Sequence, residues 1–330
     1  MESRIVECIP NFSEGRDLEV VGGIRSAIAS VPGLKVLHTD VGRDANRTVI
    51  TFAGSPEAVC EGAFRGAEAA SRLIDMRRHH GEHPRIGATD VLPLVPVRGI
   101  SLEECAVLAR RLASRIFSDL GIPCYCYEEA AFSPERRNLA WCRKGEYESL
   151  AAKMADPSLR PDFCGDYDER AALSGASVVG ARKFLLAVNF NLDSTDADLA
   201  LEIARDVREI GRKTPSGRVP GTLKGVKALG WYMAQYGCAQ VTMNITDLSA
   251  TPLHRAHEEV SRCAALRGAR VTGTELIGLI PEEAILQAGK HFCKKGNPSA
   301  DDLIKAADEA LGLSTIRPFD PSSRILEYLI

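Results

Sequence analysis

The chain has 330 residues, which suits two packed domains of about 100–200 residues each. Hydrophobic residues make up 45% and charged residues 26% of the sequence, a balance that is ordinary for a globular protein and excludes a disordered or fibrous one. The formal net charge of −3 argues against a basic surface for nucleic acid, so we expect no nucleic-acid partner. Any anion site must therefore be a local concentration of Lys and Arg.

The sequence also restricts the compartment in which we expect the protein. No apolar run approaches the ~20 residues that a membrane helix needs, and Met1-Glu2-Ser3-Arg4 lacks the basic-then-apolar layout of a signal peptide. The ten cysteines are scattered, several of them within apolar segments, and Cys124-Tyr125-Cys126 is not a C-x-x-C pair. We expect free thiols in a reducing, cytoplasmic setting without membrane contact.

The first 127 residues predict an alternation of strands and helices. Ser55-Pro56-Glu57 is typical of a helix start, with Ser as N-cap, Pro at the first helical position and an acid in the first turn. Ser101 followed by Glu104 is a capping box. The expected strands are 4–10, 34–39, 48–52, 90–97 and 122–127, and the expected helices are 18–31, 55–74 and 101–120.

Residues 128–182 show a looser pattern, with one expected helix at about 146–154 and a polar, Gly-rich stretch over 164–180. We place a domain boundary at the end of this stretch, which gives an N-terminal subdomain of 1–181 and a C-terminal subdomain of 182–330.

The second half restarts with an expected strand at 184–192 and a helix at 196–210 capped by Asp193 or Ser194. Thr251-Pro252 is expected to open a helix as Ser55-Pro56 does. The other expected elements are strands at 226–233 and 239–245, strand-like runs at 270–273 and 276–279, helices from 281 and over 301–311, and an apolar segment at 324–329.

The two halves repeat one order of elements: strand, helix, strand, strand, helix, strand. Asn11-Phe12 and Asn189-Phe190 both stand at the end of the first strand of a half. This order predicts a sheet with helices on one face. We therefore expect an α+β fold (an α/β sandwich) of two subdomains, each a mixed β-sheet with helices on one outer face in a ferredoxin-like βαββαβ order, with a ligand cleft or tunnel between them.

Three of the seven histidines lie within His79-His80-Gly81-Glu82-His83. Gly81 and Pro84 disfavour a helix, so these residues are expected in a loop, where reactive groups are common. Three interpretations remain open. One is a metal site, although the H-E-x-x-H order is absent. A second is a general base with a partner that fixes its tautomer. The third is a solvated loop or histidines satisfied in packing.

Residues 210–246 contain no Asp or Glu. Such a segment can bring Arg and backbone N–H groups onto carboxylates or phosphates, or it can be an exposed basic loop without a ligand. No P-loop pattern supports nucleotide binding. The basic residues are Arg212, Lys213, Arg218, Lys224 and Lys227.

Polar residues in the first third of the chain add smaller candidates. Asn11, Ser13 and Glu14 precede a helix N-terminus, where they could help to hold a carboxylate or simply cap the helix. Asp40 is a candidate to orient a histidine. Asp44 is expected to be a turn residue.

A close resemblance to the glutamate formimidoyltransferase family begins in Val6-Glu7-Cys8-Ile9-Pro10-Asn11-Phe12-Ser13-Glu14-Gly15. It continues in Asn46-Arg47-Thr48-Val49 and in the loop His79-His80-Gly81-Glu82-His83-Pro84-Arg85. Further similar runs, which extend the resemblance over essentially the whole chain, lie at 72–76, 180–185, 230–232, 239–241, 244 and 318–319.

The resemblance implies transfer of the formimino group from N-formimino-L-glutamate to N5 of tetrahydrofolate, with no metal. Tetrahydrofolate would be a co-substrate in a tunnel between the subdomains. The catalytic histidine falls on His83 and its supporting aspartate on Asp40. We expect the substrate- and folate-binding residues to be Asn11, Ser13, Glu14, Arg47, Arg85, Cys164, Gly165, Asp166, Tyr167, Ser174, Gly175, Lys183 and Arg218.

The segment 164–175 is longer and more charged than the corresponding stretch of animal members, and the chain is too short to contain their fused cyclodeaminase domain. We expect a homodimer that works with a separate cyclodeaminase in histidine degradation. The alternatives are formyl transfer between 5-formyl-tetrahydrofolate and glutamate on the same site, a non-catalytic folate-binding protein, and a metallohydrolase that uses the loop histidines.

Overall fold

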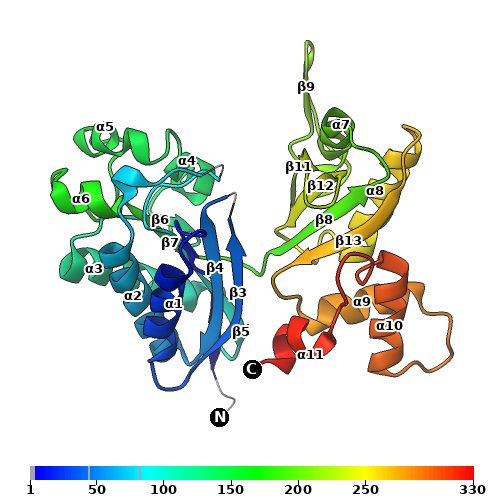
Figure 1. Ribbon diagram of the computed structural model, residues 1–330, viewed down its shortest axis with the longest axis horizontal. Coiled ribbons are helices and arrows are strands. Elements are labelled where there is room, and N and C mark those ends of the chain that lie inside the picture. The colour runs from blue at the N-terminus through cyan, green and yellow to red at the C-terminus, as the bar shows by residue number, and fades with distance from the viewer. Residues whose placement is uncertain (1–3, 44, 82) are drawn as a thin grey trace. The chain divides into compact units, whose positions relative to one another are not determined.

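The computed structural model describes residues 4–43, 45–81 and 83–330, so Asp44 and Glu82 lie outside the described residues. The chain divides into two compact units between Lys183 and Phe184, and Figure 1 shows a sheet with helices in each. The limits predicted from the sequence place this division two residues earlier. None of the helices in the described part of the chain combines the length and the apolar character needed to span a bilayer.

Within the described residues, the first unit is built on a seven-stranded mixed sheet. Its strands are β1 (Ile5–Cys8), β2 (Asn11–Phe12), β3 (Leu34–Gly42), β4 (Arg47–Gly54), β5 (Thr89–Arg98), β6 (Cys124–Glu128) and β7 (Ser177–Ala181). β1 and β2 lie end to end, since both pair antiparallel with β4 and with β5. β3 extends the sheet beyond β4, and β7 and β6 extend it in parallel beyond β5.

Helices α1 (Leu18–Ala29), α2 (Pro56–Leu73) and α3 (Leu102–Leu120) pack on one face of this sheet, as predicted (Figure 1). The hydroxyl of Ser55 accepts the N–H of Ala58 at the start of α2, and Ser101 forms a capping box with Glu104 at the start of α3. Both helix starts were therefore correctly predicted from local capping patterns.

The other face of the sheet is covered over β5, β7 and β6. There the short helices α4 (Leu139–Cys142), α5 (Leu150–Ala155) and α6 (Glu169–Ser174) enclose a second cluster that includes Tyr125, Tyr127 and Val178. Because neighbouring residues of a strand point to opposite faces, Cys124, Cys126 and Val179 lie in the cluster beneath α1–α3 instead. The rest of this face, over β2, β3 and β4, carries polar side chains.

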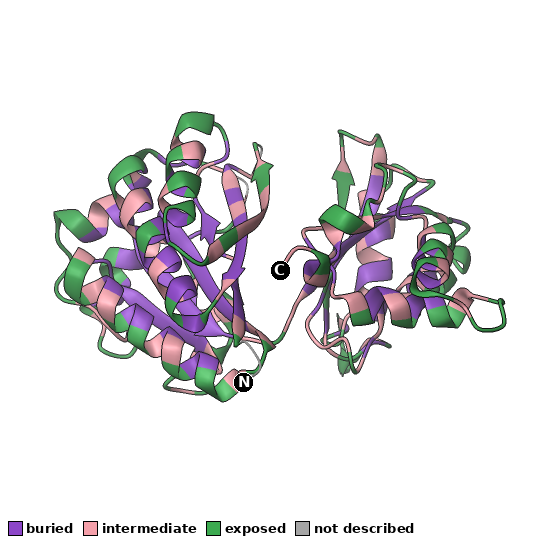
Figure 2. Ribbon diagram, turned by 90° about the horizontal axis from the view of Figure 1, so that it is seen from below, coloured by how far each residue is buried: buried purple, intermediate pink, exposed green. Residues whose placement is uncertain are grey.

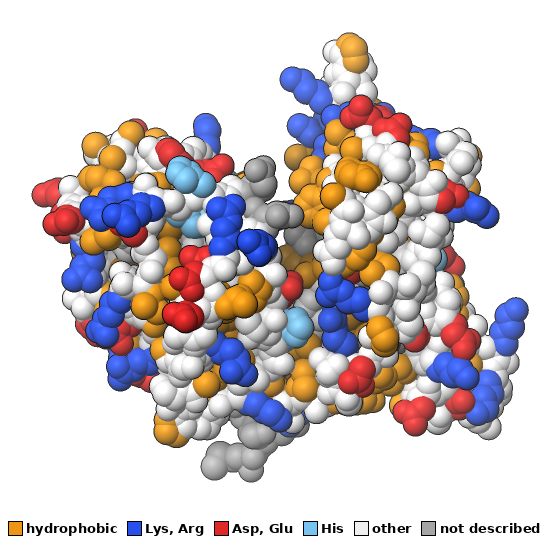
Figure 3. Space-filling view, in the orientation of Figure 1, with side chains coloured by type: hydrophobic (Ala, Val, Ile, Leu, Met, Phe, Trp, Pro, Cys, Tyr) orange, Lys and Arg blue, Asp and Glu red, His pale blue; other side chains and the backbone are white. Residues whose placement is uncertain are grey.

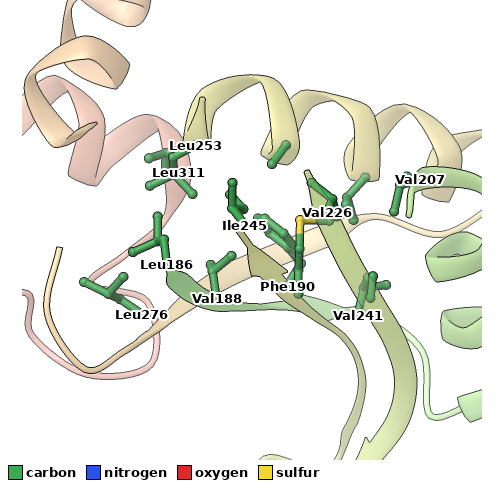
Figure 4. Packing of buried hydrophobic residues seen from close by; sticks show 14 of the residues in the cluster. Leu186, Val188, Phe190, Val207, Val226, Val241, Ile245, Leu253, Leu276 and Leu311 are labelled. Atoms are coloured by element: carbon green, nitrogen blue, oxygen red, sulfur yellow. The ribbon is translucent and has the colours of Figure 1, made fainter. Parts of the chain in front are cut away.

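The second unit contains an antiparallel sheet in the order β11-β12-β8-β13. Its strands are β8 (Leu186–Leu192), β11 (Val226–Met233), β12 (Cys238–Ile245) and β13 (Val271–Ile277), and its main helices are α7 (Ala197–Val207), α8 (Leu253–Ala265), α9 (Glu282–Phe292) and α10 (Ala300–Leu311). Figure 4 shows Leu186, Val188 and Phe190 of β8 packing with residues of the neighbouring strands and helices. Burying a side chain of this size contributes about 1.5–3 kcal/mol.

Both units share a ferredoxin-like order. The first strand of each unit lies between the third and the fourth, which is the order β3-β4-β1/β2-β5 in one and β11-β12-β8-β13 in the other. The predicted repeat of elements is thus confirmed. Figure 2 shows buried residues concentrated in the strands and on the inner sides of the helices of each unit.

Several elements differ from the prediction. β7 is a fully buried strand that begins inside the polar, Gly-rich stretch 164–180, where no strand was predicted, and α7 is capped by Asp196 rather than by Asp193 or Ser194. The helix start at Thr251-Pro252 is confirmed in position, but the Thr251 hydroxyl donates to the carbonyl of Lys224 and does not cap the helix. The remaining elements are the hairpin β9 (Arg212–Thr214) and β10 (Gly217–Val219), the helix α11 (Pro321–Arg324) and the 3-10 turns η1 (Met76–Arg78), η2 (Glu135–Arg137), η3 (Tyr147–Ser149) and η4 (Leu326–Tyr328).

Candidate active site

His83 lies in the loop between η1 and β5, and its side chain is half-buried. Its Nδ1 atom is 2.7 Å from the carbonyl oxygen of Pro84. Because a carbonyl oxygen can only accept, Nδ1 carries the hydrogen and Nε2 is the nitrogen with a free lone pair. This is the tautomer that a histidine needs to accept a proton from a ligand.

The surroundings of His83 keep its ring neutral. Burial lowers the pKa of His83 to about 3, helped by the positive charges of Arg47 and Arg143, against which the hydrogen bond to Pro84 acts weakly. A neutral imidazole at pH 7 is the form in which Nε2 can act as a base.

Arg47 is the first residue of β4, and its guanidinium group points to the polar face of the sheet. One terminal nitrogen donates to Oδ1 of Asn11, whose own side-chain N–H groups are held by the carbonyl of Ile9. The Nε atom of Arg47 is buried and has no hydrogen-bond partner among the described residues. Burial, followed by the charge of Arg143, lowers the pKa of Arg47 to about 10. A buried cation with an unused donor is a natural place for an anion.

Arg143 follows α4 and is paired with Asp90. Its Nε atom donates to Oδ1 of Asp90 at 3.2 Å and a terminal nitrogen donates to Oδ2, so the pair is bidentate. The Asp90 side chain is only 2% exposed, and its Oδ1 also accepts the N–H of Ile86 at 3.0 Å. Asp90 therefore ties Arg143 to the chain segment that follows His83.

A β-bulge accounts for the direction of the Asp90 side chain. Asn11 pairs with Val91 and Phe12 with Thr89, which leaves Asp90 without an opposite residue. Bulges re-aim side chains and are common next to active sites. Neither Asp90 nor Arg143 was predicted: the two are 53 positions apart, and the one available signal was an acid at the start of an otherwise apolar strand.

Asp40 lies on β3 opposite Val49, which itself pairs with Asn11, so Asp40 shares the polar face with Asn11 and Arg47. It is exposed, and the described contacts of His83 run to Pro84 rather than to Asp40. Its negative charge acts on Arg47, where it favours the protonated form. The structure thus connects Asp40 to the site through Arg47.

His79 and Arg85 form a buried structural pair next to this site. The Nε2 atom of His79 donates to the carbonyl of Asn46 at 2.9 Å, and Nδ1 accepts from Nε of Arg85 at 3.2 Å. The terminal nitrogens of Arg85 bind Glu146, Glu148 and the carbonyl of His79. A substrate carboxylate could bind Arg85 only by displacing one of these partners. Among the described residues, no three His, Cys, Asp or Glu side chains are arranged to hold a metal ion.

The side chains of Ser13 and Glu14, in the loop before α1, both form hydrogen bonds to backbone groups. The Ser13 hydroxyl donates to the carbonyl of Gly87 at 2.7 Å. One carboxylate oxygen of Glu14 accepts the backbone N–H groups of Gly15, Arg16 and Asp17 at 2.7–3.0 Å. Of the two alternatives left open for this loop, a bound carboxylate and simple capping, the contacts of Glu14 correspond to capping.

Comparison with known proteins assigns this site to a family. The model described as "Formiminotransferase domain, N-terminal subdomain" matches residues 5–182, and the model described as "Formiminotransferase domain" matches residues 187–330. The chain belongs to the formiminotransferase family. Its first unit therefore corresponds to the N-terminal subdomain that carries His83.

Two kinds of formiminotransferase relatives are similar to this chain. Glutamate formimidoyltransferase of Thermoplasma acidophilum is 39% identical over 92% of this chain and 99% of its own length, and that of Streptococcus pyogenes serotype M1 is 39% identical over 88% and 93%. Formimidoyltransferase-cyclodeaminase of Sus scrofa is 45% identical over 99% of this chain, which spans 60% of the length of that relative.

The segment that the formiminotransferase resemblance assigns to folate, 164–175, divides into two parts. Cys164 is held by Nε of Arg160 at 3.1 Å, and the residues after it, through Tyr167, are exposed. Ser174 and Gly175 are buried and pair through their backbones with residues 86–88. The structure therefore joins the end of this segment, but not its beginning, to the loop of His83.

Two further predicted ligand-binding residues of this formiminotransferase chain are exposed, one in each unit. Lys183 is exposed at the end of the first unit, and Arg218 is exposed on the β9–β10 hairpin of the second. The basic segment 210–246 contains no acid of its own, but acids of α7 neutralise part of its charge. Arg212 pairs with Glu202 and Asp206 of α7. Figure 3 shows basic side chains beside the projecting hairpin with acidic ones below it.

Proposed function

We propose that this protein transfers the formimino group of N-formimino-L-glutamate to N5 of tetrahydrofolate, which yields 5-formimino-tetrahydrofolate and L-glutamate. The proposal draws on relatives of this name that the chain covers almost fully. The observation that carries it is the neutral His83, whose free Nε2 lies in the field of two arginines.

His83 serves the reaction as a proton carrier. N5 of tetrahydrofolate attacks the formimino carbon and must lose a proton, which Nε2 of His83 accepts. The same proton passes to the departing glutamate nitrogen, so the ring returns to its neutral form at the end of each cycle. Positioned acid–base catalysis of this kind is worth about 10²–10⁴ in rate, and holding both substrates in one site adds to it. No step requires a metal ion.

The proposed pathway is histidine degradation. Some relatives are named for both a formimidoyltransferase and a cyclodeaminase, and this chain spans 60% of their length. We propose that a cyclodeaminase on a separate chain consumes the product, that the protein acts in the cytoplasm, and that it forms a homodimer.

Product formation tests this function directly. Purified protein is mixed with tetrahydrofolate and N-formimino-L-glutamate, and 5-formimino-tetrahydrofolate is followed by its absorbance and by mass spectrometry. A parallel reaction of 5-formyl-tetrahydrofolate with L-glutamate tests formyl transfer. Folate binding without either product would leave a non-catalytic binding protein and contradict the proposal.

A further inference from the structure

Among the described residues, the polar face of the first unit brings two half-buried arginines together with one buried carboxylate. Arg47 and Arg143 both act on His83, and the charge of Arg143 lowers the pKa of Arg47. The buried carboxylate among these residues is Asp90, which is committed to Arg143. Two neighbouring guanidinium groups with a single buried carboxylate are costly unless an anion joins them.

The hydrogen bonds of Arg47 and Arg143 also indicate room for an anion, because each arginine has a donor without a partner among the described residues. Nε of Arg47 is buried without a partner among the described residues. Arg143 directs Nε and one terminal nitrogen to Asp90, and its other terminal nitrogen makes no hydrogen bond to a described residue. Both arginines are close enough to His83 for their charges to lower its pKa. Planar guanidinium donors are suited to the two oxygens of a carboxylate.

We propose that Arg47 and Arg143 together bind one carboxylate group of the substrate beside His83, and that Asp90 is the residue that positions Arg143. Only the naming of N-formimino-L-glutamate as the carrier of this carboxylate rests on the proposed function. The site itself selects an organic acid over an uncharged amide of the same shape.

Occupancy of this site changes the chemistry of His83. Among the described residues, the charges that act on the ring are those of Arg47 from β4 and Arg143 from the segment after α4. These arginines are in turn acted on by Asp90 from β5, and Arg47 also by Asp40 from β3. A bound carboxylate offsets the two positive charges, so protonated His83 becomes less unfavourable. The base is therefore weak in the empty site and becomes competent to take a proton when the acid is present.

Proton affinity and binding can be measured on the full-length protein without catalysis. The imidazole signals are titrated by NMR with glutarate as the probe and with glutaramide as the uncharged control, and His83→Asn identifies the signal of His83. We expect glutarate to raise the apparent pKa of His83 by one unit or more and glutaramide to leave it unchanged. Equal effects of the two compounds, or none, would overturn the proposal.

Substitution of the arginines provides a second test. Arg47→Gln and Arg143→Gln should each weaken glutarate binding by about 10–100-fold in calorimetry, the range expected for hydrogen bonds to a charged group. Arg78→Gln is the matched control, because Arg78 precedes the same loop and its side chain is 87% exposed. Losses at Arg47 and Arg143 no larger than at Arg78 would contradict the assignment.

A double-mutant cycle tests the role of Asp90. If Asp90 acts by positioning Arg143, Asp90→Asn should weaken glutarate binding strongly in the wild type and little in Arg143→Gln. Independent, additive losses would mean that Asp90 has a general structural role, and circular dichroism of each variant shows whether the fold is kept. Carboxylate binding without formimino transfer would refute the proposed function alone, whereas transfer with unchanged KM in the arginine variants would refute this site alone.

Discussion

At the scale of a single residue, the surroundings of His83 decide its tautomer and its charge. Its backbone carbonyl partner fixes the tautomer, and burial with Arg47 and Arg143 keeps the ring neutral. Asp40, which we expected to orient the ring, lies on the same face and acts on Arg47. His83 and Arg47 were both predicted as site residues from the resemblance, whereas Arg143, which also acts on His83, was not.

The first prediction concerns His83. His83→Asn should lower turnover by about 10²–10⁴, because the side chain acts mainly in the transition state, and should leave folate affinity nearly unchanged. Single-turnover kinetics and equilibrium binding separate the two effects. His80→Asn serves as the control from the same loop. If that control is the inactivating change, His80 and not His83 is the base.

At the scale of elements, a close backbone contact at Gly175 explains why the sequence pattern did not predict the strand β7. β7 follows Gly175, whose φ is +65°, and a Cβ atom there would lie 2.3 Å from the carbonyl oxygen of Ile86. A buried parallel strand entered through such a contact has neither amphipathic alternation nor a capping signal. The Gly-rich composition of 164–180 therefore did not predict a strand, although Gly175 is needed there for the close approach to Ile86.

The second prediction compares two glycines. Gly175→Ala should lower the free energy of unfolding by about 3 kcal/mol or more, since it combines left-handed backbone strain with overlap against a neighbouring backbone. Gly237→Ala is the control, with φ +63° but no atom within 4 Å of the added Cβ, and should cost about 1 kcal/mol. Chemical denaturation measures both, and equal losses would show that the contact at Gly175 is not limiting.

The third prediction concerns the basic segment 210–246. Arg212 is neutralised by α7, so the remaining candidates for attracting the anionic folate tail are exposed, and Arg218 and Lys224 are two of them. The other two are Lys213 and Lys227. Combined replacement of Arg218 and Lys224 by Gln should flatten the rise of KM with ionic strength and leave the chemical rate at saturation unchanged, because exposed charges act within a screening length of about 8–10 Å. The exposed pair Arg270 and Lys305 is the control. An unchanged salt dependence would assign 210–246 to an ordinary solvated loop.

At the scale of the whole molecule, the repeated order of elements was the most reliable signal. Each half buries apolar residues at spacings set by strand and helix geometry, and these spacings survive in the sequence. The ion pair of Asp90 and Arg143 leaves no such pattern in the sequence. It depends on a bulge at Asp90 and on the position of Arg143, which is 53 residues away in the chain. Such a pair forms only when the sheet is assembled, so a local sequence pattern cannot predict it.

The fourth prediction is an acid-sensitive fold. His79, His83, His254 and His257 all have a pKa lowered first by burial. In the unfolded chain these rings take up protons as the pH falls below about 6.5, while the folded protein keeps them neutral further into the acid range. The contribution of these neutral histidines to the free energy of unfolding should therefore be complete above pH 7. It should decrease as the pH falls from about 6.5.

Denaturant titrations between pH 7.5 and 5 measure this dependence. His257→Leu, which removes one buried ring, should make the decrease shallower. A flat profile of the wild type over this range would contradict the neutral, buried state of these histidines.

The backbone contact near Gly175 also makes the two segments mechanically dependent on each other. Ala88 donates its N–H to the carbonyl of Ser174 at 2.7 Å, and Ala176 donates to that of Ile86 at 3.0 Å. A ligand that restrains residues 174–176 should therefore also restrain residues 86–88, which follow His83 in the chain. Slower amide hydrogen exchange at Ala88 and Ala176 on ligand binding would show that the loop of His83 is coupled to residues 174–176 through the peptide backbone.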